Sequence, residues 1–183
     1  MVGMAGTSMA PGAERLVVLA AAGDEEAFEQ IVRHHHRDLT RIAFVVTGDP
    51  DIADQAAAAT WVIAWKRLRS LREPERLKPW LCSIAANEAR QLVRSQRRRR
   101  VVEIAVVNDE RRTAPDPATR IGDVDLANAM ARLSVDDRSL VALRYICGLN
   151  STELAQVTGL TASGVRGRLA KILDRLRKEL GDE

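Results

Sequence analysis

The sequence predicts an all-α protein made of two small helical domains joined by a linker. Apolar residues recur at three- and four-residue spacing along most of its 183 residues. Capping residues stand where these periodic stretches begin, and no stretch alternates apolar and polar residues as a half-buried strand would. A change in composition between residues 101 and 122 separates the two helical parts, and the chain length allows two small domains.

The N-terminal part is predicted to form four helices between residues 14 and 97, preceded by a disordered tail over residues 1–13. Capping residues, glycines and a first-turn proline mark the helix boundaries. A polar loop over residues 70–75 precedes the fourth helix, whose last turns become basic. The residues expected to end or begin the first three helices are Gly23, Asp24, Gly48, Asp49 and Pro50.

The C-terminal part, residues 123–183, is also predicted to form four helices. Residues 150–171 match a helix-turn-helix: a short helix, a turn at Gly159 and a second helix. Asn150 and Glu153 are spaced as a capping box. The expected N-caps are Asp123, Ser134, Asn150 and Thr161. The expected buried positions of the motif are Leu154, Ala155, Leu160, Val165 and Leu169.

The second helix of this motif carries a polar, basic face that is expected to point outward. Such side chains reach base edges and phosphates when a helix enters the major groove. The alternative interpretation is an αα-hairpin with a basic face toward solvent. The residues expected to contact DNA are Ser163, Arg166, Arg168 and Lys171.

Charge is segregated along the chain, although the formal net charge is only +3. Residues 24–59 carry a net charge of −5, residues 60–100 of +9 and residues 101–137 of −4. Arginine supplies 24 of the 28 basic residues, and its planar guanidinium matches phosphate and guanine. The basic block is typical of a nucleic-acid surface, the alternative being a solvated helix face.

Several functional classes find no support in the sequence. No apolar run is long enough to span a membrane, and the first residues do not resemble a secretory signal. His34, His35 and His36 point in different directions on a helix, so we expect no metal site. No catalytic or phosphate-loop motif is present. We therefore expect no enzymatic activity, cofactor, small-molecule substrate or membrane insertion.

Aromatic residues and cysteines carry further expectations. On residue type alone, Trp65 and Trp80 are expected in the core. Cys82 and Cys147 lie far apart in sequence, fit a reduced cytoplasmic compartment and are expected to be buried thiols.

The paired arrangement of two segments resembles a known family. D-P-D-I-A-D-Q at residues 49–55, T-W-V-I-A-W-K-R-L at 60–68 and P-W-L-C-S-I-A-A-N-E-A-R-Q-L-V-R at 79–94 resemble region 2 of bacterial sigma factors. Residues 133–169, with L-S-V-D-D-R-S-L and L-T-A-S-G-V-R-G-R-L at their ends, resemble region 4. The linker without an intervening domain is similar to that of the extracytoplasmic-function (ECF) group.

The resemblance implies a function in transcription initiation. It implies a region 2 domain at residues 14–100, a linker at 101–122 and a region 4 domain at 123–183. The chain would bind core RNA polymerase, recognise and open promoter DNA, and be held inactive by an anti-sigma factor. The implied polymerase contacts are Asp51, Asp54, Gln55 and Trp65. The implied contacts to the −10 element are Asn87, Arg90, Arg94, Arg97 and Arg98.

The implied reader of the −35 element is the second helix of the helix-turn-helix. The sequence departs from the family pattern at Ala58 and Ala59, where Gln and Glu are usual, and at Gly164 and Gly167. A stand-alone helix-turn-helix regulator is the alternative function.

Overall fold

The computed structural model describes residues 11–104 and 121–181. These residues form helices and short turns and contain no strand, which confirms the all-α prediction. Residues 1–10 and 105–120, most of the predicted tail and linker, lie outside the described residues. The helices are α1 (Pro11–Ala21), α2 (Glu25–Thr47), α3 (Pro50–Arg67), α4 (Leu77–Ile104), α5 (Ile121–Ala131), α6 (Val135–Tyr145), α7 (Ser151–Thr158) and α8 (Ala162–Leu180).

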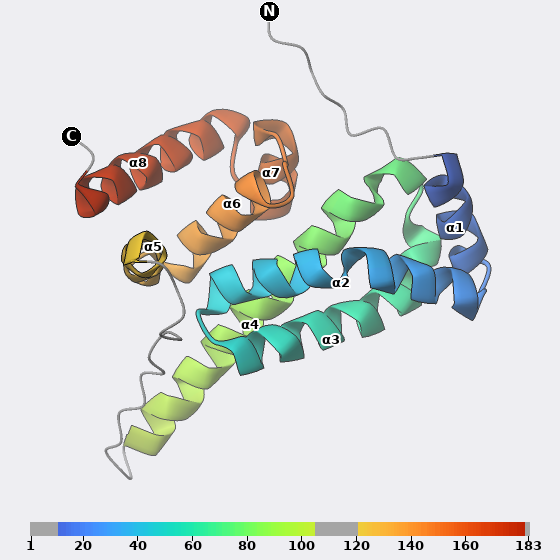
Figure 1. Ribbon diagram of the computed structural model, residues 1–183, viewed down its shortest axis with the longest axis horizontal. Helices are drawn as coiled ribbons and strands as arrows, with labels where there is room; N and C mark the ends of the chain where they lie inside the picture. Colours follow the sequence, from blue (N-terminus) through green and yellow to red (C-terminus); the bar gives the residue numbers. More distant parts are fainter. Residues whose placement is uncertain (1–10, 105–120, 182–183) are drawn as a thin grey trace, which may run out of the picture.

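Helices α2, α3 and α4 pack side by side as a bundle, and α1 contacts one end of α2 (Figure 1). The side chains of Asp24 and Asp49 cap α2 and α3 as predicted, accepting from backbone N–H groups three residues on. Gly48 ends α2 with a φ of 73°, a conformation that glycine adopts without strain. Alanine lines much of the buried face of α3, so these helices approach closely without large side chains.

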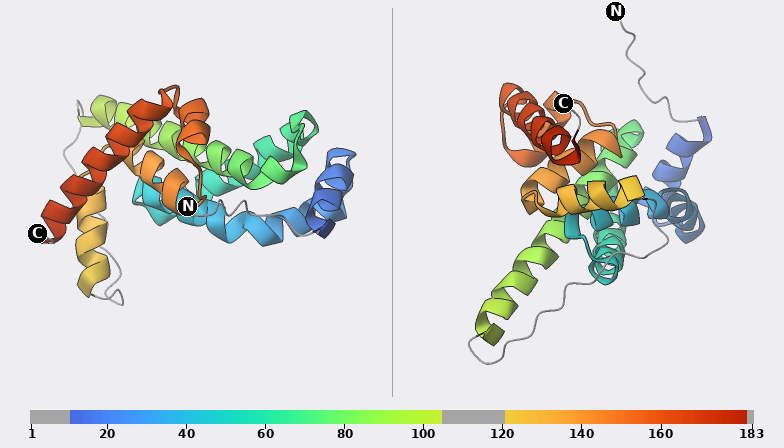
Figure 2. Two further views of the ribbon diagram at one scale, coloured as in Figure 1. Left: turned by 90° about the horizontal axis from the view of Figure 1, so that it is seen from above. Right: turned by 60° about the vertical axis from the view of Figure 1, so that its left-hand side comes forward.

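Helix α4 is longer than the sequence predicted. The sequence pattern predicts its end near residue 97, yet it continues to Ile104, into the segment assigned to the linker. No glycine or proline interrupts the chain between Pro79 and Ile104, and most of the intervening residues are good helix formers. The last turns of α4 extend away from the rest of the molecule (Figures 1 and 2).

The C-terminal helices begin at predicted caps, with one exception. Asn150 accepts from two N–H groups of α7 while the Glu153 carboxylate accepts from the Asn150 N–H, which completes the capping box. Ser134 and Thr161 cap α6 and α8. The prediction of Asp123 as an N-cap is wrong, because α5 already begins at Ile121. Local preferences leave a helix start free to shift by a residue or two.

Helix α6 joins the two halves of the molecule. It packs against α2 and α4 of the N-terminal bundle as well as against α7 and α8 (Figure 1). Leu140 and Leu143 on α6 are each 1% exposed and belong to the same apolar cluster as Leu39 and Leu81. The described residues thus adopt a closed arrangement, with one continuous core shared by both halves.

His35 is a buried titratable group within this core. It lies on the inner face of α2 with 8% of its surface exposed. Burial and the neighbouring positive charges of His34 and Lys78, partly opposed by Asp38, lower the pKa of His35 to about 4. The histidine is therefore packed as a neutral ring at pH 7.

The depressed pKa of His35 predicts a loss of stability in mild acid. The unfolded chain binds a proton near pH 6.5 and the folded chain only near pH 4, so stability is full above pH 6.5 and falls towards pH 4. The loss attributable to His35 should approach about 3 kcal/mol. Urea unfolding at pH 7 and pH 4.5 measures it.

Variants isolate this contribution. His35→Leu should show a smaller loss between the two pH values, whereas His34→Gln, which removes a smaller contribution than burial to the His35 shift, should keep most of the loss. Equal losses in the His35→Leu variant and the unaltered protein would contradict the prediction.

Candidate polymerase and nucleic-acid interface

The predicted polymerase-binding residues lie on one exposed stripe of α3. Asp51, Asp54, Gln55 and Trp65 recur at three-, four- and seven-residue multiples, so they share a helix face. All four are exposed, and the buried alanines of α3 lie on the opposite side. Val62 belongs to the same stripe and is 54% exposed. Sequence reasoning missed Val62, although its spacing from Asp51 and Trp65 places it there.

The aromatic residues beside this stripe correct one expectation. Trp65 is 39% exposed and packs edge to face on Phe28 with ring centroids 4.8 Å apart, so its assignment to the core is wrong. The helix register turns this position outward at the end of α3. Trp80 is half-buried and packs against the core, so the expected core position is met in part. Trp61 donates from its indole N–H to Nδ1 of His36 at 3.1 Å.

The residues predicted for the −10 element form a second stripe, on α4. Arg90, Arg94, Arg97 and Arg98 repeat at three- and four-residue intervals after Asn87, which brings them to one face. Arg94, Arg97 and Arg98 are exposed, while Arg90 is half-buried and donates to the Asn87 side-chain carbonyl. This face of α4 is the one that approaches α6.

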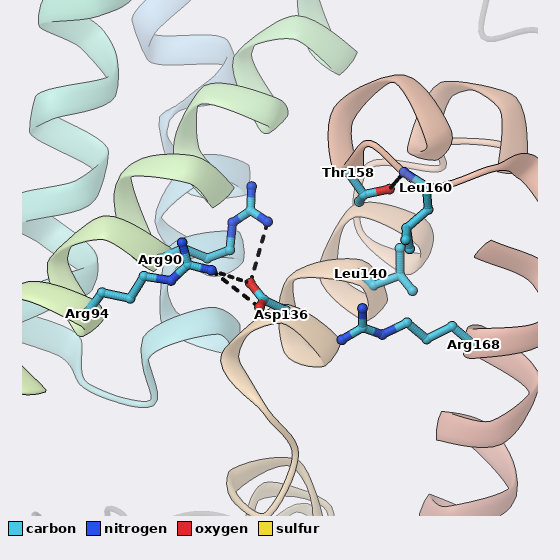
Figure 3. Close-up of a pocket in the computed structure, with 7 residues that line it drawn as sticks. All are labelled: Arg90, Arg94, Asp136, Leu140, Thr158, Leu160 and Arg168. Atoms are coloured by element: carbon cyan, nitrogen blue, oxygen red, sulfur yellow. Dashed lines mark hydrogen bonds and ion pairs between the residues drawn. The ribbon is translucent and has the colours of Figure 1, made fainter. Parts of the chain in front are cut away.

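The carboxylate of Asp136, in the first turn of α6, bridges two of these arginines (Figure 3). Its Oδ1 lies 3.1 Å from Nη2 of Arg94 and 3.6 Å from Nη1 of Arg90. The neighbouring Asp137 lies 2.6 Å from Nε of Arg168 on α8. Two adjacent acids of α6 therefore neutralise arginines from both predicted DNA-binding sets. Sequence reasoning missed this, because acids after an N-cap have a sufficient local explanation in the helix dipole.

The helix-turn-helix presents most of its predicted contacts to solvent. Ser163, Arg166 and Lys171 are exposed on α8. Arg168 projects about 160° from Arg166, because the two residues are two positions apart on the helix, and it is half-buried beside Asp137 of α6. Leu160, expected to be buried, is 36% exposed, since it lies in the turn after Gly159 rather than on either helix. The other expected core residues of the motif are buried or half-buried.

A cleft of about 180 Å³ separates α4 from the helix-turn-helix. Figure 3 shows Arg90 and Arg94 on one side, Arg168 on the other and Asp136 between them. The remaining lining residues are Leu140, Thr158 and Leu160. The cleft is thus lined by three arginines and by one acid, Asp136 of α6.

Arg138, which follows Asp137 in the first turn of α6, is buried at the interface between the two halves. Only 8% of its surface is exposed, and its Nε has no hydrogen-bond partner among the described residues. Burial, together with the charge of Arg97, lowers the pKa of Arg138. A buried N–H donor without a partner costs free energy and therefore weakens the packing that buries it.

The two cysteines meet across the same interface. Cys82 on α4 is fully buried, as expected, whereas Cys147, in the turn after α6, is only partly so. The Cys147 thiol lies near the Cys82 thiol. This contact and burial raise the pKa of Cys147, partly opposed by the charge of Lys78. Lys78 itself pairs with Asp38 at 2.9 Å.

The remaining expectations concern metals and membranes. The described residues contain no group of three or more His, Cys, Asp or Glu side chains arranged to hold a metal ion. No described helix is long and apolar enough to cross a membrane.

Comparison with known proteins supports the assignment of both halves. Residues 31–99 match the family described as Sigma-70 region 2, and residues 123–176 match Sigma-70, region 4. This chain belongs to the ECF group of RNA polymerase sigma factors. The family is one of non-enzymatic transcription initiation factors.

Several relatives match most of the sigma factor. It is 28% identical to SigM of Mycobacterium tuberculosis (strain Erdman) over 98% of this chain and 90% of that protein. It is 28% identical to CnrH of Cupriavidus metallidurans over 88% of this chain and 90% of CnrH. A probable sigma factor, RfaY of Xanthomonas campestris, is 33% identical over 88% of this chain, which spans only 42% of that longer protein.

Two solved structures share the fold. CnrH in complex with the cytosolic domain of CnrY matches with a TM-score of 0.66 and 26% identity, over 93% of this chain and 98% of CnrH. RpoE of Bartonella quintana in complex with the anti-sigma factor NepR matches with a TM-score of 0.71 and 23% identity, over 84% and 96% of the two chains.

The acid–arginine contacts predict that the closed arrangement of the sigma factor depends on Asp136 and Asp137. The double variant Asp136→Ala/Asp137→Ala should populate open forms more than the unaltered protein, because it leaves three arginines unpaired near one another. Each partly exposed pair contributes about 0.2–1 kcal/mol, so the shift should be a few-fold. Small-angle scattering should record a larger radius of gyration.

A matched control removes an acid without touching the interface. Asp174→Ala breaks a pair with Lys178 within α8 and should leave the radius of gyration unchanged. An equal expansion in the control, or none in the double variant, would count against the predicted role of α6.

Proposed function

We propose that the sigma factor divides promoter recognition between its two halves. The N-terminal half, at residues 14–100, would bind core RNA polymerase and the −10 element, and the half at 123–183 the −35 element. It would act in the cytoplasm, where the polymerase transcribes. The observation that carries the proposal is that one chain combines an exposed acidic and apolar stripe on α3 with arginine faces on α4 and α8.

The stripe on α3 has the chemistry of a protein interface. Val62 and Trp65 are exposed large apolar side chains in one row, and Asp51, Asp54 and Gln55 flank them. An apolar centre with a polar rim is typical of specific protein–protein contacts. Alanine at positions 58 and 59, where the resemblance to the family implies Gln and Glu, leaves Val62 and Trp65 as the main large apolar contacts of this stripe.

Substitution of the stripe should abolish polymerase binding without unfolding the protein. Val62→Glu/Trp65→Ala places a charge and removes a ring on the exposed face, and we expect at least about tenfold weaker binding to core polymerase, since buried interface aromatics often contribute 2 kcal/mol or more. Native gel shift with purified core polymerase measures the binding, and run-off transcription from a two-element promoter measures initiation.

Lys66→Ala is the control on the same helix, because Lys66 is exposed at the edge of the stripe. It should bind core polymerase normally. Failure of the unaltered protein to bind core polymerase would overturn the proposal, and tight binding to duplex DNA without polymerase would favour the stand-alone regulator.

The arginine faces have the chemistry of DNA contacts. Arg94, Arg97 and Arg98 would follow the phosphates of the opened strand near the −10 element, and Asn87 and Arg90 would lie closest to its bases. Ser163, Arg166 and Lys171 would reach the −35 element in the major groove. Gly167 has no side chain and has open space beside it, so this position adds no contact to DNA. A larger share of the −35 contacts would therefore come from Arg166.

Arg94→Ala and Arg166→Ala should weaken promoter binding by the holoenzyme in different ways. Loss of Arg94 removes a phosphate contact to single-stranded DNA and should lower the salt slope by about 0.7. Loss of Arg166 should cost about 1–3 kcal/mol on a promoter with an intact −35 element and little on one whose −35 element is scrambled.

Filter binding across a salt series distinguishes the two effects. Arg33→Ala, which breaks an exposed pair with Glu29 on α2, is the control and should bind as the unaltered protein does. A uniform effect of Arg166→Ala on both promoters would contradict a role in reading the −35 element.

The closed arrangement cannot be the DNA-bound one in this scheme. Asp136 forms ion pairs with Arg90 and Arg94, and Asp137 forms one with Arg168. DNA and α6 would therefore compete for the same guanidinium groups. Binding to a promoter with two separate elements would draw α6 away from α4. The closed arrangement would therefore be the form of the free protein.

An anti-sigma factor is the further partner we propose. The solved structure of CnrH holds the cytosolic domain of CnrY, and that of RpoE holds the anti-sigma factor NepR. A polypeptide with an apolar helix face could cover Val62 and Trp65, the surface proposed for core polymerase. Competition with core polymerase for this surface would then inhibit transcription.

A further inference from the structure

The two cysteines of the chain occupy positions that only the closed arrangement brings together. Cys82 belongs to the N-terminal bundle and Cys147 to the turn that leads from α6 into the helix-turn-helix. Their thiols lie near each other, because α6 packs on α4 and both cysteines belong to or pack against the shared core. The chain has no other cysteine, so an intramolecular disulfide has one possible pairing.

The surroundings make one thiol of the pair accessible and place a cation near both. Cys147 is partly exposed, whereas Cys82 behind it is fully buried. The ammonium of Lys78 acts electrostatically with both thiols while paired to Asp38. A nearby cation favours the thiolate, which is the reactive form of cysteine.

We propose that Cys82 and Cys147 form a reversible disulfide when the free protein meets a peroxide, and that this bond locks the closed arrangement. The lock rests on the function proposed above, because it inhibits only if promoter binding needs α6 to leave α4. The formation of the bond does not rest on it.

The chemistry balances with peroxide as the oxidant. The Cys147 thiolate attacks one peroxide oxygen and breaks the O–O bond, which gives a sulfenic acid and, after protonation, one water. The Cys82 sulfur then attacks the sulfenic sulfur and expels hydroxide, which takes the remaining thiol proton and leaves as a second water. Two thiols lose two electrons in total, and one hydrogen peroxide becomes two waters.

The environment of the pair sets the rate of the first step. Because burial and the Cys82 contact raise the pKa of Cys147, thiolate is scarce in the closed form. Oxidation should therefore be slower than that of an exposed thiol and respond to sustained rather than brief exposure. The sulfurs must come to about 2 Å, and the position of Cys147 in a turn allows this adjustment.

The bond would fix the charges around α6 as well as its position. The disulfide would tie the C-terminal end of α6 to α4. Asp136, at the N-terminal end of α6, would then stay beside Arg90 and Arg94. Oxidation would thus hold the arginines of α4 away from promoter DNA. Reduction by a small thiol would release them.

The first experiment detects the bond itself. Full-length reduced protein is treated with excess hydrogen peroxide, alkylated with N-ethylmaleimide and measured by intact mass and after trypsin. We expect an unalkylated monomer about 2 Da lighter, because disulfide formation removes two hydrogens. The tryptic peptides 77–90 and 145–166 should be linked. Cys147→Ser and Cys82→Ala should each abolish the link.

The second experiment measures the lock by run-off transcription with core polymerase. Oxidised protein should give at least about tenfold less run-off transcript, because a covalent closure shifts the population strongly to the closed state. Dithiothreitol should restore initiation. Peroxide-treated Cys147→Ser should keep its activity, and because this position is partly exposed the variant should fold.

Each outcome decides one part of the proposal. A treated monomer whose cysteines remain unlinked overturns the disulfide, and a linked monomer with full transcription overturns the lock. If the reduced protein fails to initiate at all, the proposed function fails, and the linked peptides still decide whether the disulfide forms.

Discussion

The packing of α6 against α2 and α4 is the contact on which the rest of the structure depends. Leu140 and Leu143 enter the core of the N-terminal bundle, so the two halves share one apolar cluster. This position brings the first turn of α6 to the arginine face of α4 and its C-terminal end to Cys82. The basic cleft, the acid–arginine pairs and the thiol pair are all consequences of this one contact.

Apolar burial and charge contribute differently to this contact. Burying a leucine side chain contributes about 1.5–3 kcal/mol, whereas a partly exposed ion pair contributes about 0.2–1 kcal/mol. The leucines therefore supply most of the free energy of docking, and the ion pairs of Asp136 and Asp137 contribute a smaller part. An interface built in this way is specific and still reversible.

Features that arise within a few residues of sequence could be predicted, and those that join distant residues could not. The helix caps depend on hydrogen bonds between residues only two or three positions apart in sequence. These caps are Asp24, Asp49, Ser134, Asn150 and Thr161. The faces of α3, α4 and α8 follow from helix periodicity. The pairing of Asp136 with Arg94, like the meeting of the cysteines, depends on tertiary docking, for which the sequence carries no periodic signal. The predictions that Trp65 and Leu160 are buried are wrong, because residue type says little about burial at the end of a helix or in a turn.

Arg138 lowers the stability of the contact between α6 and the N-terminal bundle. Its buried Nε has no hydrogen-bond partner among the described residues, which costs the closed arrangement free energy, and Arg138 lies on neither the exposed stripe of α3 nor the outward face of α8. Replacement by an apolar residue of similar length would favour closure, and a new acid opposite it would do the same. The threshold at which the factor becomes available to the polymerase can therefore drift during evolution through this one position, while the promoter sequences that the factor reads stay the same.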